Sequence, residues 1–325
     1  MKDELEFPET LHEAIKYFAD DTRAFDYMKS VRWPNGKVSC PRCGCEEVSF
    51  ISTRKIWTCK KCVTKKQFTI RVGTILEDSP IGFDKWICAF WLIANAKNGV
   101  SSYEIHRALG VTQKTGWFML QRIRLAMQNG TIEKLSGEIE ADETYIGGKV
   151  RNMHHARKLK RGRGTGGVGK AIVMGLLERN SDKKASKVKL KHVQNARRAT
   201  VQGEIRQHVE TGSQVFTDAL PSYNGLNSDY IHKAIDHARE YVRGNVHTNG
   251  LENFWCLLKR CFKGTYVSVE PFHLFRYLDE QTFRFNERED TDQGRFEKIM
   301  SGILGKRLTY AQLIGENETE LVPAA

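Results

Sequence analysis

Apolar side chains recur at helical spacing over the first third of the chain. Positions 11, 15, 18, 25 and 28 are apolar and predict one or two short helices near the N-terminus. Three more helices are expected over residues 83–97, 102–109 and 113–128. Ser101 and Glu104 form a capping box for the second of these, and Gly110 lies in the short turn before the third. Two helices joined by such a turn have the outline of a helix-turn-helix.

The pattern changes to strands after Gly137. Alternating or apolar runs predict strands over residues 138–146, 171–179, 187–193, 213–220 and 230–238. Helices are expected between and after them, over residues 197–210 and 271–288. Strands and helices that follow a largely helical stretch predict an α+β fold with several domains.

A further helix, predicted over His247–Arg260, carries two neighbouring stripes of different character. Leu251, Trp255 and Leu258 recur at the spacing of a buried face. A carboxylate and a lysine two turns apart border this face, which is typical of a functional site, although an ordinary solvated helix face shows the same pattern. The polar stripe consists of Asn249, Glu252, Cys256 and Lys259.

Four cysteines have the spacing of a metal site. Cys40 and Cys43 form one C-x-x-C, and Cys59 and Cys62 form a second one after fifteen intervening residues. Each pair directs two thiolates at one point, and two pairs complete a tetrahedral Zn²⁺ shell. Cys45 could compete with Cys43, but the register of the first turn favours Cys43. We therefore expect one structural Zn²⁺ in a zinc ribbon, with short strands over residues 47–52 and 67–72.

The charge of the chain favours a polyanionic partner. Its 325 residues carry a net charge of +12, and the segment 149–170 holds eight Lys or Arg, five Gly and no acidic residue. We expect this segment to be a loop that follows a DNA backbone. The helix over residues 113–128 also presents basic side chains that suit phosphates. The predicted DNA-binding residues are Lys114, Arg122, Arg157, Lys158, Arg161, Arg163 and His247.

Membranes are excluded as partners by the same reading of the sequence. The longest apolar run, Trp86–Ala96, is broken by Asn95 and is far shorter than the roughly 20 residues of a membrane-spanning helix, so we expect a buried helix there. The acidic N-terminal residues lack the apolar region of a signal peptide. These features predict a cytoplasmic protein.

Three carboxylates stand in distinctive positions: Asp142 within one predicted strand, Asp218 near the end of another, and Glu252 on the later helix. Two-metal phosphoryl transfer needs carboxylates that converge on a pair of divalent cations. Asp142 is followed by Glu143, and the alternation of a strand leaves open which of the two points toward the site. Three unrelated acids on separate elements would show the same spacing.

Several stretches, taken together, resemble the zinc-ribbon DDE transposases of bacterial insertion sequences, the ISXO-type group. They run in that family's order from Arg32 to Arg288. The matching stretches are CPRCG, CKKC, QFTIRVGTILEDS, GEIEADETYIGGK, HTNGLENFWCLLKR and FRYLDEQTFRFNER. The resemblance implies an RNase H-like α/β catalytic domain with a mixed sheet. It also implies a DNA transposase that binds terminal inverted repeats and catalyses strand cleavage and strand transfer with two Mg²⁺ or Mn²⁺ ions per active site.

The matching motifs assign Asp142, Asp218 and Glu252 to the three catalytic, metal-binding places, and Lys259 to the basic position seven residues further on. Members of the group vary at the third place, where Asn can replace the acid, so Asn249 stays open as an alternative to Glu252. The implied partners are double-stranded DNA, as transposon ends and as target, and further copies of the chain in a homo-oligomer on DNA. The alternative functions are a DNA-binding regulator without catalysis and an RNase H-like nuclease without strand transfer.

Five domains or segments are expected along the chain. A helical segment covers residues 1–33, and the zinc ribbon covers residues 34–78. A helix-turn-helix-like DNA-binding module follows over residues 79–134. The catalytic domain covers residues 135–290 and includes the basic loop, and residues 291–325 are expected to form a C-terminal tail.

Overall fold

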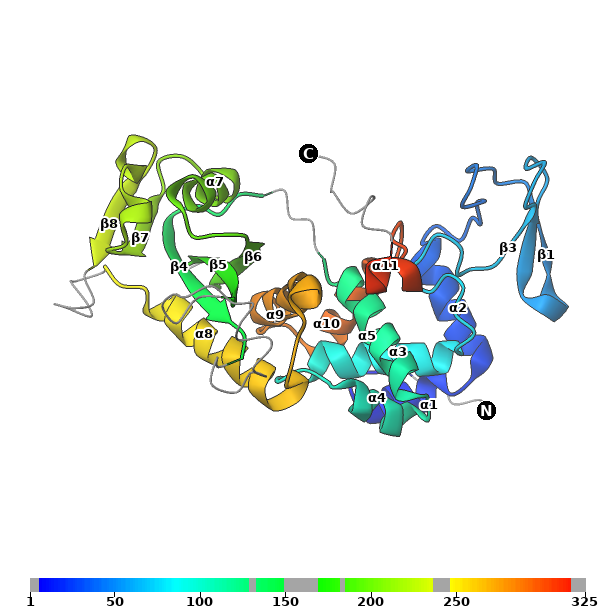
Figure 1. Cartoon of the computed structure of the whole chain (residues 1–325). Coiled ribbons are helices and arrows are strands. Elements are labelled where there is room, and N and C mark those ends of the chain that lie inside the picture. Colours follow the sequence, from blue (N-terminus) through cyan, green and yellow to red (C-terminus); the bar gives the residue numbers. More distant parts are fainter. Residues whose placement is uncertain (1–5, 129–132, 149–168, 182–184, 236–245, 317–325) are drawn as a thin grey trace. The chain divides into compact units, whose positions relative to one another are not determined.

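The computed structural model describes residues 6–128, 133–148, 169–181, 185–235 and 246–316 (Figure 1). The chain divides into two compact units, one made of residues 1–129 together with 290–325, and the other of residues 130–289. No helix in the described ranges is both long enough and apolar enough to cross a membrane.

Helix α3 (Phe83–Asn95) is the centre of the first unit. Its Trp86, Phe90 and Trp91 are buried, which confirms the helix expected from the longest apolar run. Helices α1 (Leu11–Phe18), α2 (Asp21–Arg32) and α10 (Asp292–Ser301) pack against α3. The Phe296 ring of α10 lies 4.9 Å from the Trp91 ring, so segments from opposite ends of the chain share one aromatic core.

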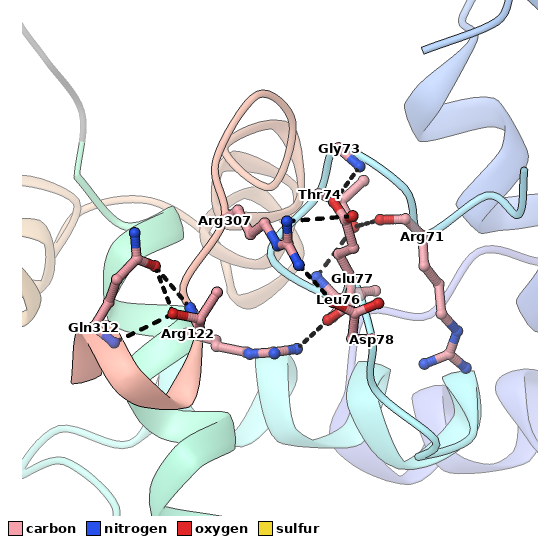
Figure 2. Close-up of polar contacts among 10 residues, drawn as sticks. Arg71, Gly73, Thr74, Leu76, Glu77, Asp78, Arg122, Arg307 and Gln312 are labelled. Atoms are coloured by element: carbon pink, nitrogen blue, oxygen red, sulfur yellow. Dashed lines mark hydrogen bonds and ion pairs between the residues drawn. The ribbon is translucent and has the colours of Figure 1, made fainter. Parts of the chain in front are cut away.

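The expectation of a C-terminal tail does not hold for residues 292–314. This stretch forms α10 and α11 (Tyr310–Ile314), and Phe296, Ile299 and Met300 of α10 are buried in the first unit. The loop between α10 and α11 also contacts the rest of the first unit, because Arg307 donates a hydrogen bond of 2.7 Å to the carboxylate of Asp78 (Figure 2). These three apolar residues have the spacing of a buried helix face and could have predicted α10. The acidic residues near the C-terminus favoured the interpretation as a tail instead.

The zinc ribbon is a three-stranded antiparallel sheet in the order β1 (Val48–Ile51), β2 (Ile56–Cys59), β3 (Gln67–Phe68). The middle strand was not predicted, because it has only four residues and follows a single 3₁₀ turn, η1 (Ser52–Arg54). Its Trp57 ring stacks between those of Phe25 and Phe68, at centroid distances of 5.8 and 5.9 Å. Aromatic stacking thereby supplies the small sheet with a core.

The predicted pair of helices after α3 is present as α4 (Ser102–Leu109) and α5 (Gln113–Ala126). The capping box of Ser101 and Glu104 forms as expected, and Gly110 ends α4 in the left-handed conformation, with φ of 60°. A Cβ atom at Gly116 would lie 2.9 Å from the carbonyl oxygen of Ser102, so this glycine allows the two helices to cross closely. The helix-turn-helix outline is therefore present, and its role in DNA binding stays a prediction.

The second unit contains a mixed five-stranded sheet in the order β6–β5–β4–β7–β8. The pairs β4–β5 and β5–β6 are antiparallel, whereas the pairs β4–β7 and β7–β8 are parallel. This confirms the expected mixed sheet. The strand bounds are Glu138–Ile146 for β4, Ala171–Glu178 for β5, Lys187–Val193 for β6, Gln214–Asp218 for β7 and Ile231–Ile235 for β8.

Helices cover both faces of this sheet (Figure 1). On one face, α7 (Arg198–His208) buries Val201 and Ile205 against Ile139 and Ala141 of β4. On the other face, α8 (Asn249–Cys261) and α9 (Leu274–Asn286) pack on β5. Two 3₁₀ turns, η3 (Pro221–Tyr223) and η4 (Leu226–Ser228), connect β7 to β8. A π-helix, η5 (Phe262–Tyr266), follows α8, and the 3₁₀ turn η6 (Pro271–His273) precedes α9.

Gly175 in β5 sets how closely α8 approaches the sheet. A Cβ atom at this position would lie 2.6 Å from the Trp255 ring and 3.0 Å from Leu251. Both of these side chains belong to buried positions of α8. The strand therefore needs a residue without a side chain at the point where the helix crosses it.

We expect Gly175→Ala to lower the free energy of unfolding by about 1–3 kcal/mol, because the added methyl group displaces α8. Gly203→Ala is the matched control, since a Cβ atom there meets nothing within 4 Å and Gly203 lies inside α7. This control should be neutral or stabilising by about 0.5–1 kcal/mol. Urea denaturation of both variants checks the prediction. Equal effects of the two substitutions would contradict the proposed contact.

Candidate active site and metal centre

The four predicted zinc ligands come together in the first unit. The Sγ atoms of Cys40, Cys43, Cys59 and Cys62 all lie within 4.8 Å of one another. Three of the Sγ–Sγ distances are 3.8 Å (Cys40–Cys62), 3.6 Å (Cys43–Cys59) and 3.4 Å (Cys62–Cys43). A tetrahedron with Zn–S bonds of about 2.3 Å has edges of about 3.8 Å, so the four thiols fit one Zn²⁺ ion.

Backbone groups complete the two turns that carry these cysteines. The N–H of Cys40 donates to the carbonyl of Cys45, and the N–H of Gly44 donates to the carbonyl of Cys40. Cys45 thus closes the first turn with its backbone and stays outside the thiol cluster, as predicted. Donation from the backbone N–H of Cys62 lowers the pKa of the Cys59 thiol to about 6, which favours the thiolate that zinc binds.

Two of the three predicted catalytic carboxylates lie on adjacent parallel strands of the second unit. Glu140 in β4 is the register partner of Phe216 in β7. The pairing of the two strands ends there, and Asp142 and Asp218 each follow two residues later on their own strands. Because side chains alternate along a strand, both carboxylates lie on the same face of the sheet as Glu140. The negative charge of Asp218 is one of the causes that raise the pKa of Asp142, which agrees with this placement.

Asp142 points toward α8. The indole Nε1–H of Trp255 donates a hydrogen bond of 2.8 Å to Oδ2 of Asp142. Asp142 is half-buried, and burial raises the pKa of its carboxyl group to about 6. The Trp255 hydrogen bond opposes this shift, and the charges of Asp218 and Glu252 add to it. Charge repulsion and burial of this kind are typical of a carboxylate group that binds a cation.

Glu143 points to the opposite face of β4, because side chains alternate along a strand. Burial is also the main cause that raises its pKa, to about 7, with the charges of Asp142 and Asp218 contributing. The hydroxyl of the fully buried Tyr223 faces this carboxylate and opposes the rise in its pKa. The geometry thus separates the two acids, with Asp142 on the α8 side, whereas the sequence pattern alone had left the choice open.

The polar stripe of α8 is exposed beside Asp142. Asn249, Glu252 and Lys259 are all exposed, while Trp255 between them is buried. Glu252 lies one turn before Trp255 and Lys259 one turn after it, so the stripe borders the residue that contacts Asp142. The charge of Glu252 also acts on Asp142, which places the two groups in one electrostatic site.

The three carboxylates are not gathered as tightly as the cysteines. Among the residues that the structure describes, Cys40, Cys43, Cys59 and Cys62 are the only group of three or more His, Cys, Asp or Glu side chains close enough to share one ion. Asp142 and Asp218 lie on adjacent strands of the sheet, whereas Glu252 lies on the helix that packs over it. The assignment of the three as magnesium ligands therefore stays a prediction.

The structure corrects the predicted DNA contact of Arg122. This arginine is only 5% exposed, and its guanidinium donates a hydrogen bond of 2.9 Å to the carbonyl of Glu77 (Figure 2). Burial lowers the pKa of Arg122 to about 10. The neighbouring Gln121 and Arg124 are buried as well, so this part of α5 faces the core of the first unit. No local pattern showed that Arg122 is buried, because its hydrogen-bond partner Glu77 lies 45 residues earlier in the chain.

The other predicted DNA contacts have different surroundings. Lys114 is exposed at the start of α5, with its ammonium 4.6 Å from the centroid of the Tyr310 ring. His247 is hydrogen-bonded through Nδ1 to Arg179 at 2.9 Å. Arg157, Lys158, Arg161 and Arg163 lie outside the described residues, as does most of the expected basic loop.

The residues whose hydrogen bonds connect α8 to β4 were not among the predicted site residues. Glu140, Arg179 and Trp255 contact the helix or the catalytic candidates, yet the pattern placed Trp255 only in the core. The signal for Glu140 was its position two residues before Asp142, on the same face of the strand. No local signal marked Arg179, because its role depends on contacts with residues far away in the sequence.

We expect Cys59→Ser to lose the bound zinc and to unfold the ribbon, because three thiolates no longer close the tetrahedral shell. The matched control is Cys45→Ser, which changes a neighbouring cysteine outside the cluster. Zinc content of the purified proteins, measured by inductively coupled plasma mass spectrometry, should fall below one per chain only for Cys59→Ser. Loss of zinc in Cys45→Ser would contradict the ligand assignment.

We expect Asp142→Asn to stabilise the metal-free second unit at neutral pH. The folded chain binds more protons than the unfolded chain between pH 3.8 and about 6, because the pKa of Asp142 rises from 3.8 to about 6 on folding. The free energy of unfolding therefore falls as pH rises through this range, by on the order of 3 kcal/mol.

Thermal unfolding from pH 4 to pH 8, in buffers cleared of free divalent cations, checks this prediction. The stability gain of Asp142→Asn over the wild type should be present above pH 6 and should vanish toward pH 4. A gain that is the same at every pH would contradict the raised pKa of Asp142.

Comparisons with known proteins agree with this arrangement of a cysteine cluster and a mixed sheet. Residues 134–286 match the ISXO2-like transposase domain, and residues 19–65 match the transposase zinc-ribbon domain. The chain is similar to an uncharacterized protein in transposable element ISH50 of Halobacterium salinarum, with 29% identity over 76% of this chain and 84% of that protein.

A second relative is shorter. An uncharacterized transposase-like protein of Haemophilus influenzae is 33% identical over 31% of this chain and 82% of its own length. Both domain matches fall on the elements described above, with the zinc ribbon ahead of the five-stranded sheet. The chain therefore belongs to the ISXO2-like transposases that carry a zinc ribbon before the transposase domain.

Proposed function

We propose that the chain is an active DNA transposase that binds transposon ends and catalyses strand cleavage and strand transfer. The observation that supports the proposal is that Asp142 and Asp218 lie on one face of two adjacent parallel strands, where the charge of Asp218 contributes to the raised pKa of Asp142. Carboxylates held close together in a half-buried site repel one another, and a divalent cation removes this repulsion. The family membership gives this site DNA as its substrate class.

Asp142, Asp218 and Glu252 are the residues that would hold two Mg²⁺ or Mn²⁺ ions. Oδ1 of Asp142 is the oxygen left for an ion, because Oδ2 accepts the Trp255 hydrogen bond. Bound divalent cations supply Lewis acidity and neutralise charge at a phosphodiester. Glu252 is preferred to Asn249 as the third ligand, since a carboxylate binds Mg²⁺ better than an amide does. The exposed Lys259, two turns after Glu252, would hold a phosphate by its point charge.

DNA recognition is assigned to the first unit. The zinc ribbon and the α4–α5 pair would bind terminal inverted repeats, with Lys114 exposed at the start of α5. The net charge of +12 supports a polyanionic partner. Transposition joins two ends, so several copies of the chain would act as a homo-oligomer on DNA.

We expect purified protein with Mg²⁺ to nick DNA that carries its own terminal repeats and to join the ends to target DNA. Asp142→Asn and Asp218→Asn should each lower the cleavage rate by roughly a thousandfold or more, because the cations lose a ligand. DNA affinity in a gel-shift assay should not fall. Glu143→Gln is the matched control, since this acid points to the other face of β4 and should retain cleavage.

Other outcomes of this assay favour other functions. Cleavage without joining would identify a nuclease of the same fold, and binding without cleavage would identify a DNA-binding regulator. Wild-type activity in Asp142→Asn or Asp218→Asn would contradict the proposed site. A larger loss in Asn249→Ala than in Glu252→Gln would move the third ligand from Glu252 to Asn249.

A further inference from the structure

We infer that Glu140 and Arg179 are positioning residues that hold α8, and with it Glu252, in register with Asp142. This inference rests on the proposed role of Glu252 as a metal ligand. It concerns two residues whose positions on β4 and at the end of β5 give them no direct part in the proposed chemistry.

Glu140 is a carboxylate at the centre of the second unit. Its side chain is 1% exposed, and it shares the α8 face of β4 with Asp142. A buried carboxylate is costly unless it is paired and hydrogen-bonded. The Glu140 carboxylate accepts one hydrogen bond from Arg179 and another from the backbone of α8, which meets this requirement.

Glu140 of β4 caps the N-terminal end of α8. Thr248, the residue before the helix, makes no side-chain capping hydrogen bond. The N–H of Leu251 in the first turn donates a hydrogen bond of 2.8 Å to Oε2 of Glu140 instead. A carboxylate is favoured here because the N-terminal end of a helix carries partial positive charge. The next residue along the helix is Glu252.

Gly250 allows the carboxylate to come this close. A Cβ atom at this position would lie 2.9 Å from Oε2 of Glu140 and 3.2 Å from Oε1. The first turn of α8 therefore presents bare backbone to the buried acid. A side chain at position 250 would push against this carboxylate and disturb its contact with Leu251.

Arg179 fixes the other side of this arrangement. Its Nε donates to Oε1 of Glu140 at 2.8 Å, and its terminal nitrogen donates to the carbonyl of His247 at 2.8 Å. The guanidinium also lies over the Phe216 ring of β7, 4.3 Å from the centroid. One arginine thus connects β4, β7 and the residues that lead into α8, which are the elements that carry the three proposed metal ligands.

The spacing of the contacts explains why this sets the site. Two residues along a strand span roughly 7 Å, and the four residues from Leu251 to Trp255 rise about 6 Å along the helix, so the two distances are similar. Glu140 and Asp142 on the strand therefore meet Leu251 and Trp255 on the helix as a matched pair of contacts. Loss of the Glu140 contact would leave the Trp255–Asp142 hydrogen bond as the remaining one of this pair, so the first turn of α8, with Glu252, could shift away from Asp142.

The test measures Mn²⁺ affinity by electron paramagnetic resonance of the full chain, together with hydrogen exchange of the Leu251 amide without metal. We expect Glu140→Ala and Arg179→Ala to raise the Kd for Mn²⁺ about tenfold or more, as the loss of a group that orients a ligand typically does. Exchange of the Leu251 amide should become faster in Glu140→Ala. Glu140→Gln keeps an acceptor oxygen and should restore most of the Leu251 protection.

A double substitution separates positioning from a general loss of stability. If Glu140 acts through Glu252, then Glu140→Ala should change Mn²⁺ affinity in the wild type but not in a Glu252→Gln background. Asp229→Asn is the control, because it removes a different ion pair of the same unit, with Arg206 at 2.8 Å. This control should leave Mn²⁺ affinity unchanged.

Two results overturn the inference: an unchanged Kd in both Glu140→Ala and Arg179→Ala, or an equal effect of Glu140→Ala with and without Glu252. Should Glu140→Ala fail to fold, Arg179→Ala and Arg179→Lys carry the same test. Failure of the proposed function has a different signature, because Asp142→Asn would then leave Mn²⁺ affinity unchanged as well.

Discussion

Helix α8 is held to strand β4 by two hydrogen bonds, and the arrangement of the candidate active site depends on them. One runs from the backbone of Leu251 to Glu140, and the other runs from the indole of Trp255 to Asp142. Gly175 in β5 and Gly250 in the helix keep the space clear for both contacts. The apolar stripe of α8 thereby seats the helix so that its polar stripe borders the carboxylates of the sheet.

This arrangement assigns different tasks to acids on one strand. Glu140 is fully committed to Arg179 and α8, Asp142 keeps one oxygen for a cation, and Glu143 points to the other face. Strand alternation and depth of burial are enough to separate these tasks. The cysteines of the zinc ribbon all have the same task, since four thiols within 4.8 Å would hold a small sheet together through one ion.

Features that depend on residues close together in the sequence were predicted correctly. The C-x-x-C spacing, the Ser101 capping box and the alternation of β4 each depend on residues within a few positions, and the structure has all three. Prediction failed where distant segments meet. Arg122 looked like a DNA contact because nothing nearby in the sequence shows that it is buried with its guanidinium bonded to the carbonyl of Glu77. The Arg179 contacts were invisible for the same reason, whereas Asp142 could be preferred to Glu143 only through the family resemblance.

We propose that Asp142, Asp218 and Glu252 together bind divalent cations, and an anomalous difference map from crystals of the chain grown with transposon-end DNA and Mn²⁺ tests this most directly. We expect Mn²⁺ peaks that share Asp142 as a ligand, with Asp218 and Glu252 completing the protein contacts. Peaks only at other residues, or peaks with Asn249 in place of Glu252, would contradict it.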